Sequence, residues 1–196
     1  YASKEGDTMK KAPHPACLLR GSLVSPSLEA AVLNGKYINA VPFARLEKEF
    51  GRYGLAITRQ NMANWTIECA DRYLAVFYDY LHKYIYKSPV IHADETPVLV
   101  RKDGREAGSK SYMWVYRTGE KEKRLIIDTI RGAQSSAIIY SIAETAKANN
   151  LKPYEYFEYL LEEIPQHMED TDLNFCENLS PWSTSLPEKC RKPGKK

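Results

Sequence analysis

The chain has 196 residues, which is enough for one domain of ordinary size with or without a small appendage. Its hydrophobic fraction of 43% and charged fraction of 27% are typical of a soluble globular protein. No apolar run approaches the roughly 18 residues that a membrane span needs, and the N-terminus lacks the apolar core of a signal peptide. We therefore expect a cytoplasmic protein with no membrane partner.

The net charge of +3 is too small to indicate a nucleic-acid partner, but its distribution is uneven. Nine Lys or Arg stand against five acids in residues 101–131, whereas residues 155–177 hold eight acids and no Lys or Arg. The first segment could face phosphate, and the second would repel it. Ordinary solvated surfaces would give the same pattern, so both interpretations stay open.

Residues 1–25 are predicted to form an irregular lead-in, and the start at Tyr1 instead of Met suggests a fragment or a processed end. Ser25-Pro26 then predicts the start of a helix. A second short helix is expected around Phe43 to Phe50, stopped by Gly51 and Gly54. The four cysteines, at positions 17, 69, 176 and 190, show no Cys-x-x-Cys motif, so we expect free thiols.

Thr58 is predicted to cap a long helix, because apolar residues from Met62 to Tyr84 recur at steps of three and four. Its first turn carries four polar side chains: Arg59, Gln60, Asn61 and Asn64. Two helices joined by a glycine-bearing turn are typical of a helix-turn-helix, whose second helix presents its N-terminal side chains to base edges. A plain helical hairpin with Met62 and Trp65 in the core fits the same residues, and this alternative stays open.

Ser88–Pro97 is predicted to be a buried strand that carries a carboxylate, because Val90 and Ile91 are β-branched. Asp94 is expected at the end of this strand, where a carboxylate can serve as a metal ligand. Alternatively, Asp94 caps a turn through its own backbone while Glu95 is solvated. We expect His92 to face away from Asp94 and to serve in the core or behind the site.

Two further strands follow, Tyr112–Tyr116 and Arg124–Asp128, and their short connections predict an antiparallel meander. A helix near 136–149 and another beginning at Pro153 form a predicted helical hairpin. The regions expected along the chain are an irregular remnant (1–25), a helical region (26–87), truncated strands (88–130), the C-terminal hairpin (136–165) and a mobile tail (166–196).

Several of these segments together resemble the transposases of the insertion-sequence family numbered sixty-six. The segments that carry the resemblance are Arg59–Trp65, His92–Val98, Ser109–Arg117 and Ser136–Asn149. The resemblance implies an α/β protein with a partial ribonuclease-H-like sheet of about three antiparallel strands. It also implies a DDE-type enzyme that cuts and joins DNA with Mg²⁺, with Asp94 as the first catalytic acid and metal ligand.

The resemblance breaks after the third strand. Where the family has a further strand with the second Asp and a later helix with the Glu, this chain passes directly into its C-terminal helix. We infer an internal deletion with its junction in residues 128–135, which leaves each cation short of ligands. Asp128 and Glu144 are weak substitutes. Zinc binding is not expected, because Ser3 and Gly6 stand where the family's zinc module would place thiolates.

The resemblance thus predicts a transposase that is catalytically incomplete, and whether the chain is an enzyme stays open. The alternative is a remnant that binds insertion-sequence DNA, a full-length transposase or a second copy of itself through residues 43–87. A decayed reading frame with no selected role is a third interpretation.

Overall fold

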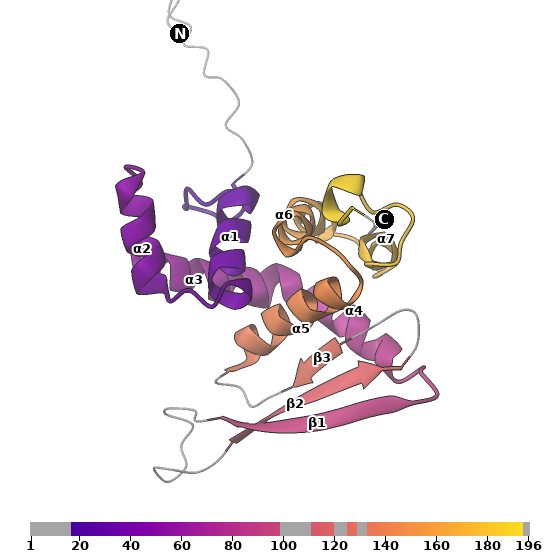
Figure 1. Ribbon diagram of the computed structural model, residues 1–196. Coiled ribbons are helices and arrows are strands. Elements are labelled where there is room, and N and C mark those ends of the chain that lie inside the picture. The colour runs from indigo at the N-terminus through magenta and orange to yellow at the C-terminus, as the bar shows by residue number, and fades with distance from the viewer. Residues whose placement is uncertain (1–16, 99–110, 120–124, 129–132, 194–196) are drawn as a thin grey trace, which may run out of the picture.

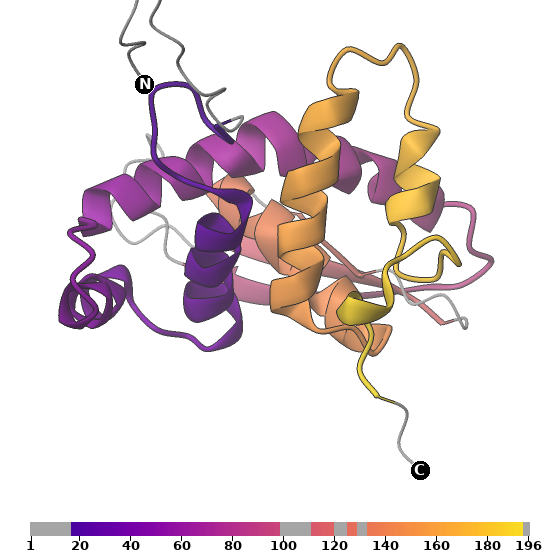
Figure 2. The ribbon, with the colours of Figure 1, turned by 90° about the horizontal axis from the view of Figure 1, so that it is seen from above.

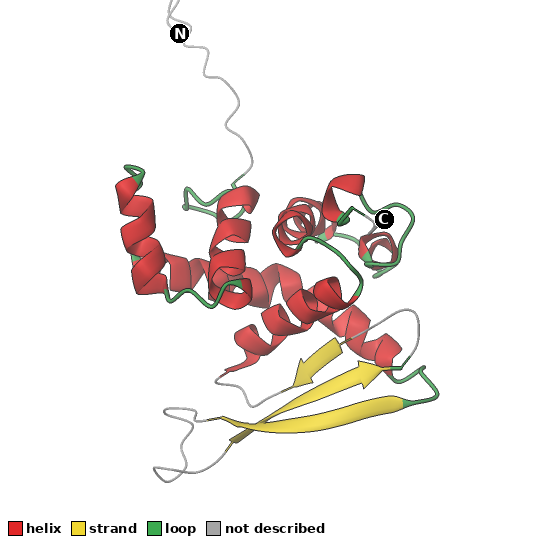
Figure 3. Cartoon of the chain, viewed as in Figure 1, coloured by secondary structure: helices red, strands yellow, loops and turns green. Residues whose placement is uncertain are grey.

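A computed structural model describes residues 17–98, 111–119, 125–128 and 133–193. Helices and a three-stranded sheet form separate layers, with β1 on the side of the sheet farthest from most of the helices (Figure 1; Figure 3). The result is a mixed α/β architecture, as expected. No helix among these residues is both long and apolar enough to cross a membrane.

The first helices begin where the sequence signals place them. Helix α1 spans Pro26–Leu33, and the Ser25 hydroxyl accepts a hydrogen bond from the Leu28 N–H at 3.2 Å. A π-helical segment, η1 (Asn34–Ile38), extends it. Helix α2 spans Phe43–Arg52, so it includes Gly51; Gly54, with φ of 79°, lies in the turn that follows. Glycine favours such a left-handed turn because it lacks Cβ.

The predicted long helix is present but contains a π-helical insertion. Helix α3 (Arg59–Cys69), η2 (Ala70–Leu74) and α4 (Ala75–Ile85) follow without a break in helical backbone angles. Thr58 caps α3 by accepting from the Asn61 N–H at 3.1 Å, which confirms the predicted start. Viewed from above, α6 crosses over this helix (Figure 2).

The sheet is the predicted antiparallel meander, with strand order β1-β2-β3. Its strands are β1 (Ile91–Val98), β2 (Ser111–Thr118) and β3 (Leu125–Asp128). Strand β1 begins three residues later than expected and continues through Pro97, which pairs with Tyr112. Proline tolerates this position because β1 is an edge strand among the described residues. The prediction of a buried strand is wrong, because residues 92–97 are exposed.

Helix α5 (Gln134–Ala148) closes the outer edge of β3. The Ser141 hydroxyl accepts from the Ile127 N–H at 2.7 Å, and the Thr145 hydroxyl accepts from the Leu125 N–H at 3.0 Å. Thr145 also donates to the Leu125 carbonyl at 3.0 Å. Four residues of a helix rise about 6 Å, and two residues of a strand rise about 7 Å. The hydroxyls of Ser141 and Thr145, one helical turn apart, can therefore reach the backbone of alternate residues of β3.

The predicted C-terminal hairpin is completed by α6 (Pro153–Glu163). The prediction of a mobile tail is wrong for residues 166–193, which the structure describes. They contain η4 (Ile164–His167), α7 (Phe175–Leu179) and η5 (Glu188–Cys190). The Lys152 N–H donates to the Cys190 carbonyl at 2.8 Å, and Cys176, Leu179, Leu186 and Cys190 are buried. Apolar side chains hold this segment in place, although its composition is polar and rich in proline.

One hydrophobic core joins the N-terminal segment, the long helix, the sheet and the C-terminal segment, from Leu18 to Cys190. A smaller cluster of Val32, Leu46 and Met62 joins α1, α2 and α3. None of the four cysteines forms a disulfide, as predicted. The packing therefore connects regions that the sequence suggests as separate.

Candidate functional site

Asp94 lies in the middle of β1, opposite Val115, and not at the end of the strand as we expected. Its side chain is exposed, and its Oδ1 accepts a hydrogen bond from the Glu95 N–H at 2.9 Å. Glu95 is exposed as well. The alternative in which Asp94 caps a turn is not realised, because Asp94 lies within a strand, although its carboxylate does accept the next backbone N–H and Glu95 is exposed.

The surroundings of Asp94 follow from strand alternation. Residues two apart share a face of the strand, so His92 lies on the same face as Asp94 and the expectation that it faces away was wrong. On the same face of the sheet, His92, Asp94 and Thr96 pair with Arg117, Val115 and Met113 of β2. His92 and Arg117 are exposed, so this end of the face is polar and open.

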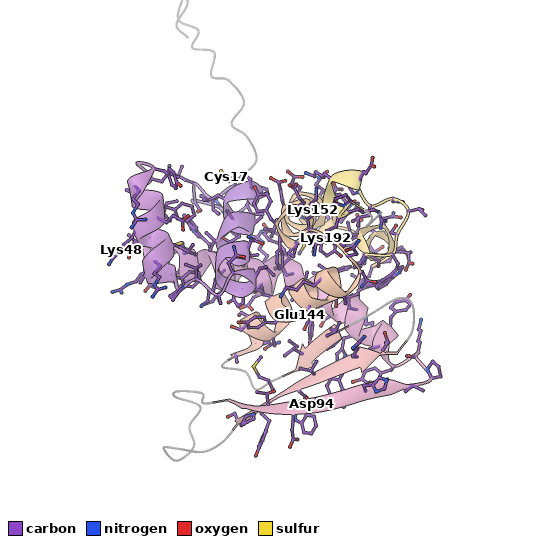
Figure 4. All side chains as sticks on the ribbon, viewed as in Figure 1. Cys17, Lys48, Asp94, Glu144, Lys152 and Lys192 are labelled. Carbon is purple, nitrogen blue, oxygen red and sulfur yellow. The ribbon has the colours of Figure 1, made fainter. Side chains whose placement is uncertain are left out.

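The described residues do not bring a second carboxylate to Asp94. Glu95 lies on the other face of the strand, and Glu144 on α5 binds Lys147 Nζ at 2.7 Å. Figure 4 shows Glu144 on the helix above the sheet and Asp94 on the far strand. The Asp128 side chain and the predicted zinc-module positions Ser3 and Gly6 lie outside the part of the chain that the structure describes.

Mg²⁺ in transposition chemistry needs several oxygen ligands for each ion. Within residues 17–98, 111–119, 125–128 and 133–193, no group of three or more His, Cys, Asp or Glu side chains is placed to hold a metal ion. One exposed carboxylate that already accepts a backbone hydrogen bond does not make such a site. The donor set that the structure describes around Asp94 therefore does not fit a pair of divalent cations.

The second candidate site is the start of α3, where Arg59, Gln60, Asn61 and Asn64 are all exposed. They lie within little more than one helical turn, and Gln60 Nε2 donates to Asn64 Oδ1 at 2.9 Å. The Arg59 N–H donates to Glu47 Oε1 of α2 at 3.2 Å, so a carboxylate stands at the positive end of the helix dipole.

Packing holds the two helices of this unit together. Leu46 of α2 and Met62 of α3 are 5% and 0% exposed and share a cluster with Val32 of α1. Trp65 is half-buried against the main core. The polar side chains at the start of α3 thus stand on a supported helix. This geometry is compatible both with the helix-turn-helix interpretation and with the plain hairpin.

A buried carboxyl that the sequence reasoning did not single out lies behind this unit. Glu29 of α1 is 0% exposed, and its Oε1 accepts from the Thr66 hydroxyl of α3 at 3.1 Å. Its Oε2 has no partner among the described residues. Burial raises the pKa of Glu29 to about 8, while the Thr66 hydrogen bond opposes the rise. The sequence does contain a signal for this burial, because Glu29 lies one helical turn before Val32 and Leu33 on an apolar helix.

Comparison with known proteins identifies the class as transposases. A family profile described as "Transposase IS66 family" matches residues 21–153, and a second, described as "IS66 C-terminal element", matches residues 141–182. The first match covers more than half of the chain, which therefore belongs to the IS66 family of transposases.

A curated relative, "Uncharacterized protein y4qI" of Sinorhizobium fredii (strain NBRC 101917 / NGR234), is 26% identical over 121 residues. The match covers 62% of this chain but only 22% of that protein. No solved structure matches the chain. The activity and the partners of a complete transposase are therefore not transferred to this chain by similarity alone.

Proposed function

We propose that this chain is a DNA-binding member of the IS66 family in which α2 and α3 act as a helix-turn-helix. The observation that carries the proposal is the exposed polar group of Arg59, Gln60, Asn61 and Asn64 at the start of α3. Guanidinium and amide groups pair with the base edges of the major groove. The Met62–Leu46 packing gives these side chains a rigid support, and family membership supplies the expectation of insertion-sequence ends as the target.

We further infer that the three-stranded sheet is the opening part of a ribonuclease-H-like fold and that Asp94 corresponds to the first acid of a DDE triad. The antiparallel meander and the place of Asp94 on its first strand support this inference. The missing second and third acids would make the chain incapable of strand transfer by itself. Its DNA binding would then act together with a full-length transposase or with a second copy of the chain.

The binding proposal is tested by fluorescence anisotropy with a duplex that carries the ends of the parent element and with a scrambled duplex. We expect the double variant Arg59→Gln/Asn61→Ala to lose most of the preference for the element ends, because each base contact contributes about 1–3 kcal/mol of discrimination. Lys83→Gln, an exposed change on α4, serves as the control and keeps the preference. Wild-type protein that ignores both duplexes, or a double variant with full preference, would contradict the proposal.

Metal-dependent nicking is not proposed for this chain by itself, because the described residues around Asp94 do not supply the ligands for a pair of divalent cations. Its test is incubation of the same duplex with Mg²⁺ or Mn²⁺, comparing the wild type with Asp94→Ala. We expect no cleavage by either protein. Cleavage that disappears in the variant would show that acids outside the described residues, or on a second copy, complete the site.

A further inference from the structure

Helix α2 has two faces of opposite character. Leu46, with Phe43 and Phe50, faces the small core, while Arg45, Lys48 and Arg52 are exposed. The three cations are spaced three and four residues apart, so they form one stripe along the helix. Lys48 lies on the outer side of α2 (Figure 4). We call Arg45, Lys48 and Arg52 the basic stripe.

The basic stripe has no internal partner that explains it. None of its three side chains makes a hydrogen bond or ion pair within the part of the chain that the structure describes, whereas Lys147 and Lys189 both bind carboxylates. One acid, Glu49, is exposed on the same face. The other acid of α2, Glu47, already accepts the Arg59 N–H. Three unpaired cations thus remain available to an external anion.

The position of the basic stripe relates it to the start of α3. Glu47 touches the first residue of α3, and the next residue along α2 is Lys48. Consecutive residues of a helix lie about 100° apart, so Lys48 lies roughly a quarter turn around α2 from Glu47, whereas Arg45 and Arg52 lie nearer to the opposite side of the helix. Lys48 therefore borders the surface that carries the polar side chains of α3, and Arg45 and Arg52 continue the stripe along the outer side of α2.

We propose that the basic stripe binds the phosphate backbone of duplex DNA beside the groove that α3 enters. This inference rests on the proposed DNA-binding function and adds a second surface to it. In a helix-turn-helix the first helix crosses the backbone, and basic side chains there fix the register of the protein without reading sequence. Separate surfaces then supply affinity and specificity: the stripe contributes salt-dependent affinity, and α3 contributes base discrimination.

The test measures the affinity for the element-end duplex across a series of salt concentrations. Each phosphate contact contributes about 0.9 to the slope of log K against log salt, so the variant Arg45→Gln/Lys48→Gln/Arg52→Gln should lower that slope by about 2 to 3. At moderate salt its affinity should fall at least about tenfold, while its ratio of element-end to scrambled binding stays at the wild-type value. Circular dichroism and thermal melting check that the exposed substitutions leave the fold intact.

The matched control is Lys83→Gln/Lys152→Gln/Lys192→Gln, which removes the same charge away from α2; Figure 4 shows Lys152 and Lys192 near the C-terminal segment. We expect the control to keep the wild-type slope. Equal losses in both triple variants would mean that net charge alone matters and would overturn the stripe, and so would an unchanged slope in the α2 variant. In either case the proposed DNA binding stands. Absence of wild-type binding would overturn both proposals together.

Discussion

Glu29 makes the stability of the fold depend on pH in a defined direction. In the unfolded chain its pKa is near the ordinary 4.5, and burial raises it to about 8 in the folded chain. Between these values the folded protein holds a proton that the unfolded chain releases, so raising the pH favours unfolding. The contribution of the neutral carboxyl is fully present below pH 4.5 and is lost as the pH rises through 8.

The size of this effect follows from the shift. Each pH unit between the two pKa values costs about 1.4 kcal/mol of unfolding free energy, so the change from pH 5 to pH 7.5 amounts to roughly 3 kcal/mol. Glu29→Gln cannot ionise, yet its amide oxygen can still accept from the Thr66 hydroxyl. We therefore expect the variant to lack this pH dependence, although its buried NH₂ costs about 1–3 kcal/mol if it finds no acceptor.

Urea unfolding followed by tryptophan fluorescence at several pH values measures the free energy of unfolding of both proteins. The two chains differ only at position 29, so the difference between the two curves isolates the effect of Glu29. We expect the wild type to lose stability relative to Glu29→Gln as the pH rises from 5 to 8. A constant difference over this range would refute the reasoning and would mean that Glu29 is solvated or paired in solution.

Two further outcomes test the packing around the candidate surfaces. Leu46→Ala should cost about 2–5 kcal/mol in urea unfolding, because Leu46 fills the cluster with Val32 and Met62, and it should weaken DNA binding if that cluster orients α3. The double variant Ser141→Ala/Thr145→Val leaves edge groups of β3 without hydroxyl partners. We expect a loss of about 2–4 kcal/mol and concentration-dependent association in analytical ultracentrifugation, and an unchanged monomer would argue against edge protection.

The helical elements could be predicted because their signals are local. Ser25 and Thr58 each bond a backbone N–H of the first helical turn, and the apolar steps from Met62 onward follow the buried side of the long helix. The π-helical segments carried no comparable signal, since an extra residue in a turn depends on how neighbouring helices pack. The exposed side chains at the start of α3 were also predictable, because a capped first turn points outward.

The wrong predictions have a common cause, because each depends on tertiary packing that local sequence patterns do not indicate. Pro97 was expected to lie at the end of a strand, but an edge strand tolerates it, so Asp94 falls in the middle of β1. The segment after Gln166 reads as mobile by composition, yet Cys176 and Leu186 are buried in the main core. Glu29 was not predicted because a single acid on a helix is usually solvated, whereas here the packing of α1 buries it beside Thr66 of α3.

The two edges of the three-stranded meander are both protected. Alternate residues of an antiparallel strand direct their N–H groups to the same side, so Glu95 and Pro97 share an orientation. The Asp94 carboxylate accepts the Glu95 N–H, and Pro97 has no N–H. Both positions therefore lie on the outer side of β1, and neither offers the free N–H donor that another strand would need. On the opposite edge, the Thr145 and Ser141 hydroxyls of α5 accept hydrogen bonds from the outer backbone N–H groups of β3. The hydrogen bond that Asp94 accepts thus occupies an edge donor of β1, and this contact requires no metal and no second acid.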